Sequence, residues 1–209
     1  MSTPRLNLVY DAFVRGIGTR WETAFYPTTD QDIPDSDLVE KEIITRYVNR
    51  ALGQLFSQII SQYTPKEISE KFPELVKKSN AISTISGIWT KASPYLHLHT
   101  VIGGWTEENV YLSVWDAAMY PIAKTQQNRS YIATTSKPAL IQLNEQVHIF
   151  PTTLNDDIYL EYIAMPVNPT TGAELTQNGT YDMPFGYHWI DKLSQIAIEL
   201  YNQASQETA

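Results

Sequence analysis

The chain has 209 residues, 43% of them apolar and 18% charged, and its 15 basic against 23 acidic side chains give a formal net charge of −8. This composition is typical of one globular domain, and the acidic balance argues against tight DNA binding through positive potential. Because cysteine is absent, disulfides, zinc fingers, iron–sulfur clusters and thiol chemistry are excluded. No apolar stretch reaches the ~18 residues of a membrane-spanning helix, so we expect a protein that folds in the cytoplasm and crosses no membrane.

Two helices are predicted in the first third of the chain. Apolar residues between Leu6 and Ile17 recur at helical spacing, which predicts a first helix there. From about 37 to 63, apolar residues fall in pairs four positions apart, which predicts a long helix with a wide apolar face. At 1.5 Å per residue this helix measures roughly 40 Å. Its apolar face therefore needs several partner elements or a neighbouring subunit.

The long helix carries signals at both ends. Asp37 and Glu40 fit a capping box at its start. Pro65 ends it and opens a shorter helix through Lys66 to Lys78, which is broken near Pro73.

The chain changes character between Ala81 and Val167, where Ile, Val, Thr, Trp and Tyr are frequent and turn residues recur at short intervals. Alternating patterns predict strands at 146–150 and 158–164, and candidate strands also lie at 82–89, 95–102 and 139–143. We expect 146–150 and 158–164 to form an antiparallel pair. Residues 110–124 fit either a helix or a strand.

The chain closes with a polar loop over 168–184 and a helix over about 187–205. We therefore expect an α+β fold, in which helices from the two chain ends (1–80 and 185–209) form a bundle and an antiparallel β-rich insertion occupies 81–167. The whole chain, 1–209, is expected to be one domain.

Motifs for enzymatic chemistry are absent from the sequence: it holds no phosphate-binding, dinucleotide-binding, serine-hydrolase or zinc-protease motif. His97 and His99 would share one face of a strand, as metal ligands do, but no third ligand is near in sequence. Asp156 and Asp157 beside Glu161 could bind a hard cation, yet Ca²⁺ needs about 6–8 oxygens and a solvated turn is the stronger interpretation. We expect no catalytic residue, metal or cofactor, and interpret the protein as a non-enzyme.

Large aromatic side chains are the candidate interface residues, because such side chains are favoured anchors at interfaces. Trp21, Phe25 and Tyr26 lie in an irregular stretch. They either pack on their own core or form an arm that lies on a neighbouring subunit. Trp105 follows a pair of glycines and is expected in a turn, where it either fills a loop or contacts a partner.

The order of several motifs resembles that of a known structural family. The helix segment Ile43-Ile44 to Ala51-Leu52 is followed by Ala92-Ser93-Pro94-Tyr95-Leu96-His97, Ser136-Lys137-Pro138, Val147-His148-Ile149-Phe150-Pro151, Tyr159-Leu160-Glu161-Tyr162-Ile163-Ala164-Met165-Pro166 and finally Tyr181 to Pro184 before a closing helix. Over about 37–205 the chain resembles the head-to-tail connector, or neck ring, proteins of tailed bacteriophages, particularly short-tailed phages.

The resemblance implies a non-enzymatic virion protein that forms a closed ring of typically twelve copies in the neck, joining the capsid portal to the tail. The helices would pack against neighbouring copies through heterologous interfaces. The β insertion would face an adjoining ring or the tail, and the ring would either contact the portal or lie further down the neck. Double-stranded DNA would pass through during ejection without specific binding. The protein would be assembled in the host cytoplasm and located in the virion.

An α+β module that binds carbohydrate or another small ligand is the alternative interpretation. Such a module would also expose Trp and Tyr side chains, so composition does not separate the two.

Overall fold

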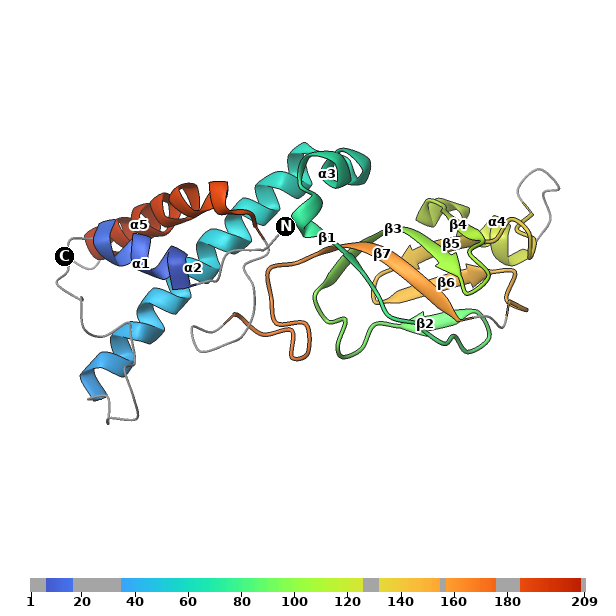
Figure 1. The fold of residues 1–209 in the computed structure, drawn as a ribbon, viewed down its shortest axis with the longest axis horizontal. Helices are drawn as coiled ribbons and strands as arrows, with labels where there is room; N and C mark the ends of the chain where they lie inside the picture. Colours follow the sequence, from blue (N-terminus) through green and yellow to red (C-terminus); the bar gives the residue numbers. More distant parts are fainter. Residues whose placement is uncertain (1–6, 17–34, 126–131, 155–156, 176–184, 208–209) are drawn as a thin grey trace. The chain divides into compact units, whose positions relative to one another are not determined.

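The computed structural model describes residues 7–16, 35–125, 132–154, 157–175 and 185–207, and within them the fold is α+β (Figure 1). The chain divides into two compact units. We call residues 1–63, 166–168 and 173–209 the helical unit, and residues 64–165 and 169–172 the β unit. The β unit is thus inserted in the helical one, and it includes residues 64–80, which the sequence analysis had assigned to the helical part.

The helical unit consists of α1 (Asn7–Gly16), α2 (Asp35–Gln62) and α5 (Ile190–Glu207). These helices arise close to the predicted positions, and the short 3-10 helix η4 (Tyr187–Trp189) leads into α5. The ring of Tyr201 on α5 meets those of Phe13 and Tyr47 edge-on, with centroids 6.0 and 5.4 Å apart. One side chain of α5 therefore contacts both α1 and α2.

A buried asparagine fastens the segment before α5 to α2. The side-chain amide of Asn49 donates hydrogen bonds to the carbonyls of Thr45 and Leu175, both at 2.8 Å, and the N–H of Leu175 donates to Asn49 Oδ1 at 3.0 Å. Both backbone groups of Leu175 thus bond to one side chain. An apolar residue at position 49 would leave these groups unpaired in the interior, which is costly.

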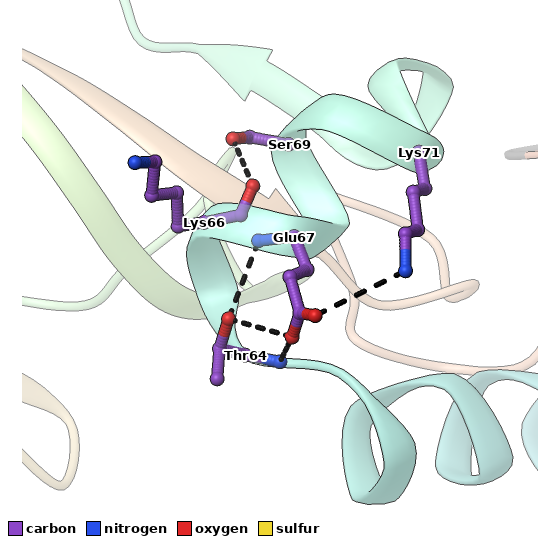
Figure 2. Close-up of polar contacts among 5 residues, drawn as sticks. All are labelled: Thr64, Lys66, Glu67, Ser69 and Lys71. Carbon is purple, nitrogen blue, oxygen red and sulfur yellow. Dashed lines mark hydrogen bonds and ion pairs between the residues drawn. The ribbon is translucent and has the colours of Figure 1, made fainter.

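The long helix ends just before a capping box that opens α3 (Pro65–Lys71), as Figure 2 shows. The N–H of Glu67 donates to Thr64 Oγ1 at 3.4 Å, and the Glu67 carboxylate accepts from the Thr64 N–H at 2.9 Å. The carboxylate also accepts a hydrogen bond from the Thr64 hydroxyl at 2.9 Å, and the two bonds that it accepts from Thr64, backbone first, with a smaller contribution from Lys71, lower the pKa of Glu67. Pro65 suits the first helical position because its missing N–H would be unpaired there.

Two helix predictions in this region are wrong. Since α2 already begins at Asp35, Asp37 lies inside its first turn and does not cap it. The helix predicted from Lys66 to Lys78 with a break near Pro73 does end close to that break, at Lys71, but the residues beyond it form a 3-10 turn (η1, Pro73–Leu75) and a strand at 76–78 and not a helix. Pro73 cannot continue the helical hydrogen bonds, and the strand pairs with 161–163.

The β unit contains a seven-stranded sheet in the order β1-β7-β3-β4-β5-β6-β2. The strands are β1 (Val76–Lys78), β2 (Ile88–Thr90), β3 (Leu98–Thr106), β4 (Tyr111–Val114), β5 (Ala139–Leu143), β6 (Gln146–Phe150) and β7 (Ile158–Ala164). All neighbouring pairs are antiparallel except β4–β5, which is parallel. The last three strands have the predicted bounds.

The predicted pairing of β6 with β7 is wrong, because β6 pairs with β5 and β2 while β7 pairs with β1 and β3. The two-residue turn Asn144-Glu145, in which Asn144 has a φ of +52°, joins β5 directly to β6. The strand predicted at 82–89 is also shorter than expected. Ser86 and Gly87 have positive φ and form a tight turn, so that only 88–90 forms β2.

The sheet curls around one apolar core. Leu160 and Tyr162 of β7 belong to the same buried cluster as Val147 and Ile149 of β6, although four places separate these strands in the sheet order. The side chains on the other face point outward. Residues 110–124, which fitted either helix or strand, form β4 followed by η2 (Ala117–Met119) and α4 (Tyr120–Thr125).

Candidate functional site

Of the four predicted interface residues, the structure describes only Trp105. Trp21, Phe25 and Tyr26 lie outside the described residues. Trp105 is described, but it lies in β3 and not in a turn, so that prediction is wrong. The glycines before it belong to the strand: a Cβ at Gly104 would lie 3.0 Å from the carbonyl oxygen of Tyr159. Glycine here allows close approach of backbone and does not mark a turn.

Trp105 lies within a group of three aromatic side chains. It is paired across the sheet with Tyr111 of β4 on one side and Tyr159 of β7 on the other. Because directly opposed residues share a face, the three rings lie together on the outer face. The centroids of Trp105 and Tyr111 are 5.9 Å apart, and the tyrosines are 51% and 37% exposed. We call Trp105, Tyr111 and Tyr159 the aromatic patch.

A cation of the chain itself lies on this patch. Lys78 Nζ is 5.0 Å from the centroid of the Trp105 ring and 3.9 Å from Glu161 Oε1. A Cβ at Gly103 would lie 3.5 Å from the Tyr111 ring and 3.7 Å from Glu161 Oε2. The tyrosine and the carboxylate therefore flank a position with no side chain. A ring face and a carboxylate together attract positive charge.

Further carboxylates lie at the end of β3 and β4 where the hairpin joins these two strands. Glu107 and Glu108 form the tip of the β3–β4 hairpin, next to the Trp105–Tyr111 pair, and both are exposed. The N–H of Glu107 donates to the carbonyl of Asp157 at 3.0 Å, which fastens this tip to the segment before β7. The Asp157 carboxylate accepts a hydrogen bond from the Ser83 hydroxyl at 2.7 Å.

Helices cover other parts of the outer face. At one end α3 contacts β3 and β7, and Ile163, which shares the face of Glu161 and Tyr159, is fully buried. Over β5 and β6, Ala123 of α4 packs in a second cluster with Ile141 and Phe150. The aromatic patch lies on the strands beyond both covers, which leaves its rings accessible.

The histidines predicted as the best metal candidates have separate partners. His97 Nε2 lies 3.1 Å from the Tyr162 hydroxyl, and His99 Nδ1 lies 2.7 Å from Thr100 Oγ1. Burial foremost, with Lys77 and Lys91, lowers the pKa of His97, and burial raises the pKa of Tyr162 to about 12. This pair is therefore neutral at pH 7. In the described ranges no three His, Asp or Glu side chains converge as a metal site would require.

Sequence reasoning found Trp105 but missed its two tyrosines. The signal was available: Tyr111 and Tyr159 each alternate with buried residues, Leu112 in one strand and Ile158 and Leu160 in the other. An aromatic residue on the outward side of an alternating strand indicates an exposed ring.

No known protein family and no curated protein matches the sequence significantly. Among the helices of the described part of the chain, none is long and apolar enough to cross a membrane.

Proposed function

We propose that the protein is a structural, non-enzymatic ring subunit in the neck of a tailed bacteriophage, where it joins the capsid portal to the tail. The observation that carries the proposal is the order of segments: a 28-residue helix, an inserted β unit over 64–165 and a closing 18-residue helix. This order agrees with the succession of motifs in which the chain resembles neck ring proteins. The protein would be located in the virion after assembly in the host cytoplasm.

The helices supply the contacts between copies in this proposal. Among them α2, at 28 residues, is longer than α1 or α5. At 1.5 Å per residue α2 exceeds α5 by about 15 Å, which leaves part of its surface for the next copy. A repeated heterologous contact of this kind closes into a ring, here of twelve copies. The β unit then faces an adjoining ring or the tail.

The proposal also includes the passage of DNA. Twelve copies carry a formal charge of 12 × (−8) = −96, so the duplex is weakly repelled over a screening distance of about 8 Å. Fluorescence anisotropy with a labelled duplex at physiological salt should therefore show no binding. Micromolar affinity that weakens steeply with added salt would contradict a passive conduit.

Assembly is tested by size-exclusion chromatography with light scattering and by negative-stain images, each with and without the portal. A ring, alone or on the portal, supports the proposal, and a persistent monomer under both conditions contradicts it. The predicted arm is tested separately with the double variant Trp21→Ala, Phe25→Ala. It should weaken assembly and leave the subunit folded. If the isolated variant unfolds, these residues belong to the core.

A carbohydrate-binding module is the second candidate, and the aromatic patch favours it. Two exposed tyrosines and a tryptophan on a sheet face, with Glu161 beside them, offer ring faces and a polar group to a sugar. A monomer that binds a neutral glycan, and loses it in Tyr111→Ala, would establish this candidate over the ring.

A further inference from the structure

We propose that the aromatic patch is a docking site for a lysine- or arginine-bearing segment of a partner protein. The inference goes beyond the ring proposal and does not depend on it, because the patch lies entirely within the β unit.

A cation of the chain itself already lies on the aromatic patch. Ring faces attract ammonium and guanidinium groups within about 6 Å of the centroid. Lys78 Nζ satisfies this condition over Trp105, with the Glu161 carboxylate nearby. The Lys78 side chain is 70% exposed, and exposed ion pairs contribute little, so a partner's cation can displace it. Lys78 is therefore an internal occupant of the site.

The charge around the aromatic patch is complementary to a cationic partner. Four carboxylates, Glu107, Glu108, Asp157 and Glu161, accompany the patch, and with Lys78 they sum to a formal 1 − 4 = −3. This charge repels nucleic acid and anionic lipid, and it offers a neutral sugar hydrogen bonds but no net electrostatic attraction. A cationic segment gains from the carboxylates and from the ring faces together.

The shape of this surface also suits a long side chain. Because Gly103 is buried and has no side chain, the Tyr111 ring and the Glu161 carboxylate lie close against the strand backbone, where a Cβ would already contact both. The hairpin tip beside it is held by the bond from Glu107 to Asp157. A long basic side chain can lie along such a surface with its stem on the rings and its charge near the carboxylates.

The test uses a fluorescently labelled hexa-arginine peptide, titrated with the full-length protein by anisotropy at low and physiological salt. Tyr111→Ala removes a ring and leaves the net charge unchanged, so it should weaken binding about twofold to fivefold. Glu161→Gln should weaken binding similarly. Lys78→Met removes the internal occupant and should tighten binding by a few-fold.

The matched controls lie elsewhere on the protein. Tyr187→Ala removes a tyrosine that is 56% exposed in the helical unit, and Glu70→Gln removes an exposed carboxylate on α3. Both variants should bind the hexa-arginine peptide with nearly the affinity of the wild type. Glu70→Gln should show only the small effect of removing one charge. Circular dichroism verifies that every variant is folded.

Three results would overturn the proposal. Equal affinity for the wild type and Tyr111→Ala means that the peptide responds to bulk charge alone. Salt-independent binding of a neutral oligosaccharide such as chitohexaose, lost in Tyr111→Ala, assigns the patch to sugar. Self-association that Tyr111→Ala abolishes, without any peptide effect, assigns it to a second copy. Ring formation is measured separately, so failure of this inference is distinguishable from failure of the ring proposal.

Discussion

Two aromatic groups on the outer face of the same sheet have opposite surroundings. The covered cluster consists of Tyr120, His148 and Phe150, in which the Tyr120 ring meets the other two at 4.8 and 6.1 Å. Phe150 is only 4% exposed, whereas Tyr111 of the aromatic patch is 51% exposed. The residue types are similar in both groups, so composition does not explain the difference.

The difference follows from the connections between strands. The link from β4 to β5 spans 115–138, and its described part carries η2 and α4 over β5 and β6. A parallel pair needs a long crossover of this kind. By contrast, β3 and β4 are joined by a tight hairpin at 107–110. This connection is too short to form a helix that would cover the neighbouring rings. Connection length thus decides which rings become core and which remain accessible.

The largest expected effect is in the covered cluster. Phe150→Ala should lower the free energy of unfolding by about 3–5 kcal/mol, because it removes a buried ring and leaves a cavity. Urea denaturation measures this loss, and Phe150→Leu should recover much of it. A loss below about 1 kcal/mol for the alanine variant would mean that α4 does not bury the Phe150 ring.

An intermediate effect is expected from pH. Burial first, and then Lys124, lowers the pKa of His148 in the folded protein, so the unfolded chain binds the proton more readily. The contribution of neutral His148 to the free energy of unfolding is therefore fully present above the pKa of the unfolded chain, about 6.5. This contribution is lost as the pH falls below that value. His97 and His99 contribute in the same direction. Unfolding measured from pH 8 to 5 should show a decline, and His148→Phe should reduce its slope. An unchanged slope would contradict the assignment to this residue.

A small effect is expected in the aromatic patch. Tyr111→Ala should change the free energy of unfolding by at most about 1 kcal/mol, because half of the side chain is already in water. Thermal and urea denaturation provide the check. A loss comparable to that of Phe150→Ala would show that the patch serves as core, and the contrast between the two groups would disappear.

No effect is expected from chelation. His97 and His99 have separate hydrogen-bond partners, and the described residues include no further ligands near them. EDTA should leave the melting temperature and assembly unchanged. A decrease of several degrees would reveal a bound metal and would reopen the histidine pair as a site.

The sequence predicted the elements better than their pairing. Period-2 patterns predict 146–150 and 158–164 at their observed bounds, because alternation is a local property, and the candidate strand at 139–143 also has its observed bounds. The pairing of β6 was decided by the tight turn at Asn144, which joins β6 to β5. The longer link between β6 and β7 does not pair these two strands. Similarly, Asp37 and Glu40 match a capping box in sequence but lie inside α2, whereas Thr64 and Glu67 form a box that opens α3, since a cap works only where a helix begins.

The candidate site was also predictable only in part, because it depends on strand pairing, which local sequence patterns do not determine. The two glycines before Trp105 predict a turn aromatic there, but the residues that it pairs with are 6 and 54 positions away in the chain. Only the sheet register brings Tyr111 and Tyr159 to it. Exposure also depended on the path of the β4–β5 connection, which no local pattern encodes.

Hydroxyl-radical footprinting of the free and hexa-arginine-saturated protein tests most directly whether the aromatic patch is a binding surface. In the free protein Tyr111 should be oxidised much faster than Phe150, in proportion to exposure. With peptide, Tyr111 and Trp105 should become protected, while Tyr187 in the helical unit and the covered cluster keep their rates. Unchanged oxidation of Tyr111 and Trp105 under saturation, or equal protection of Tyr187, would contradict the account.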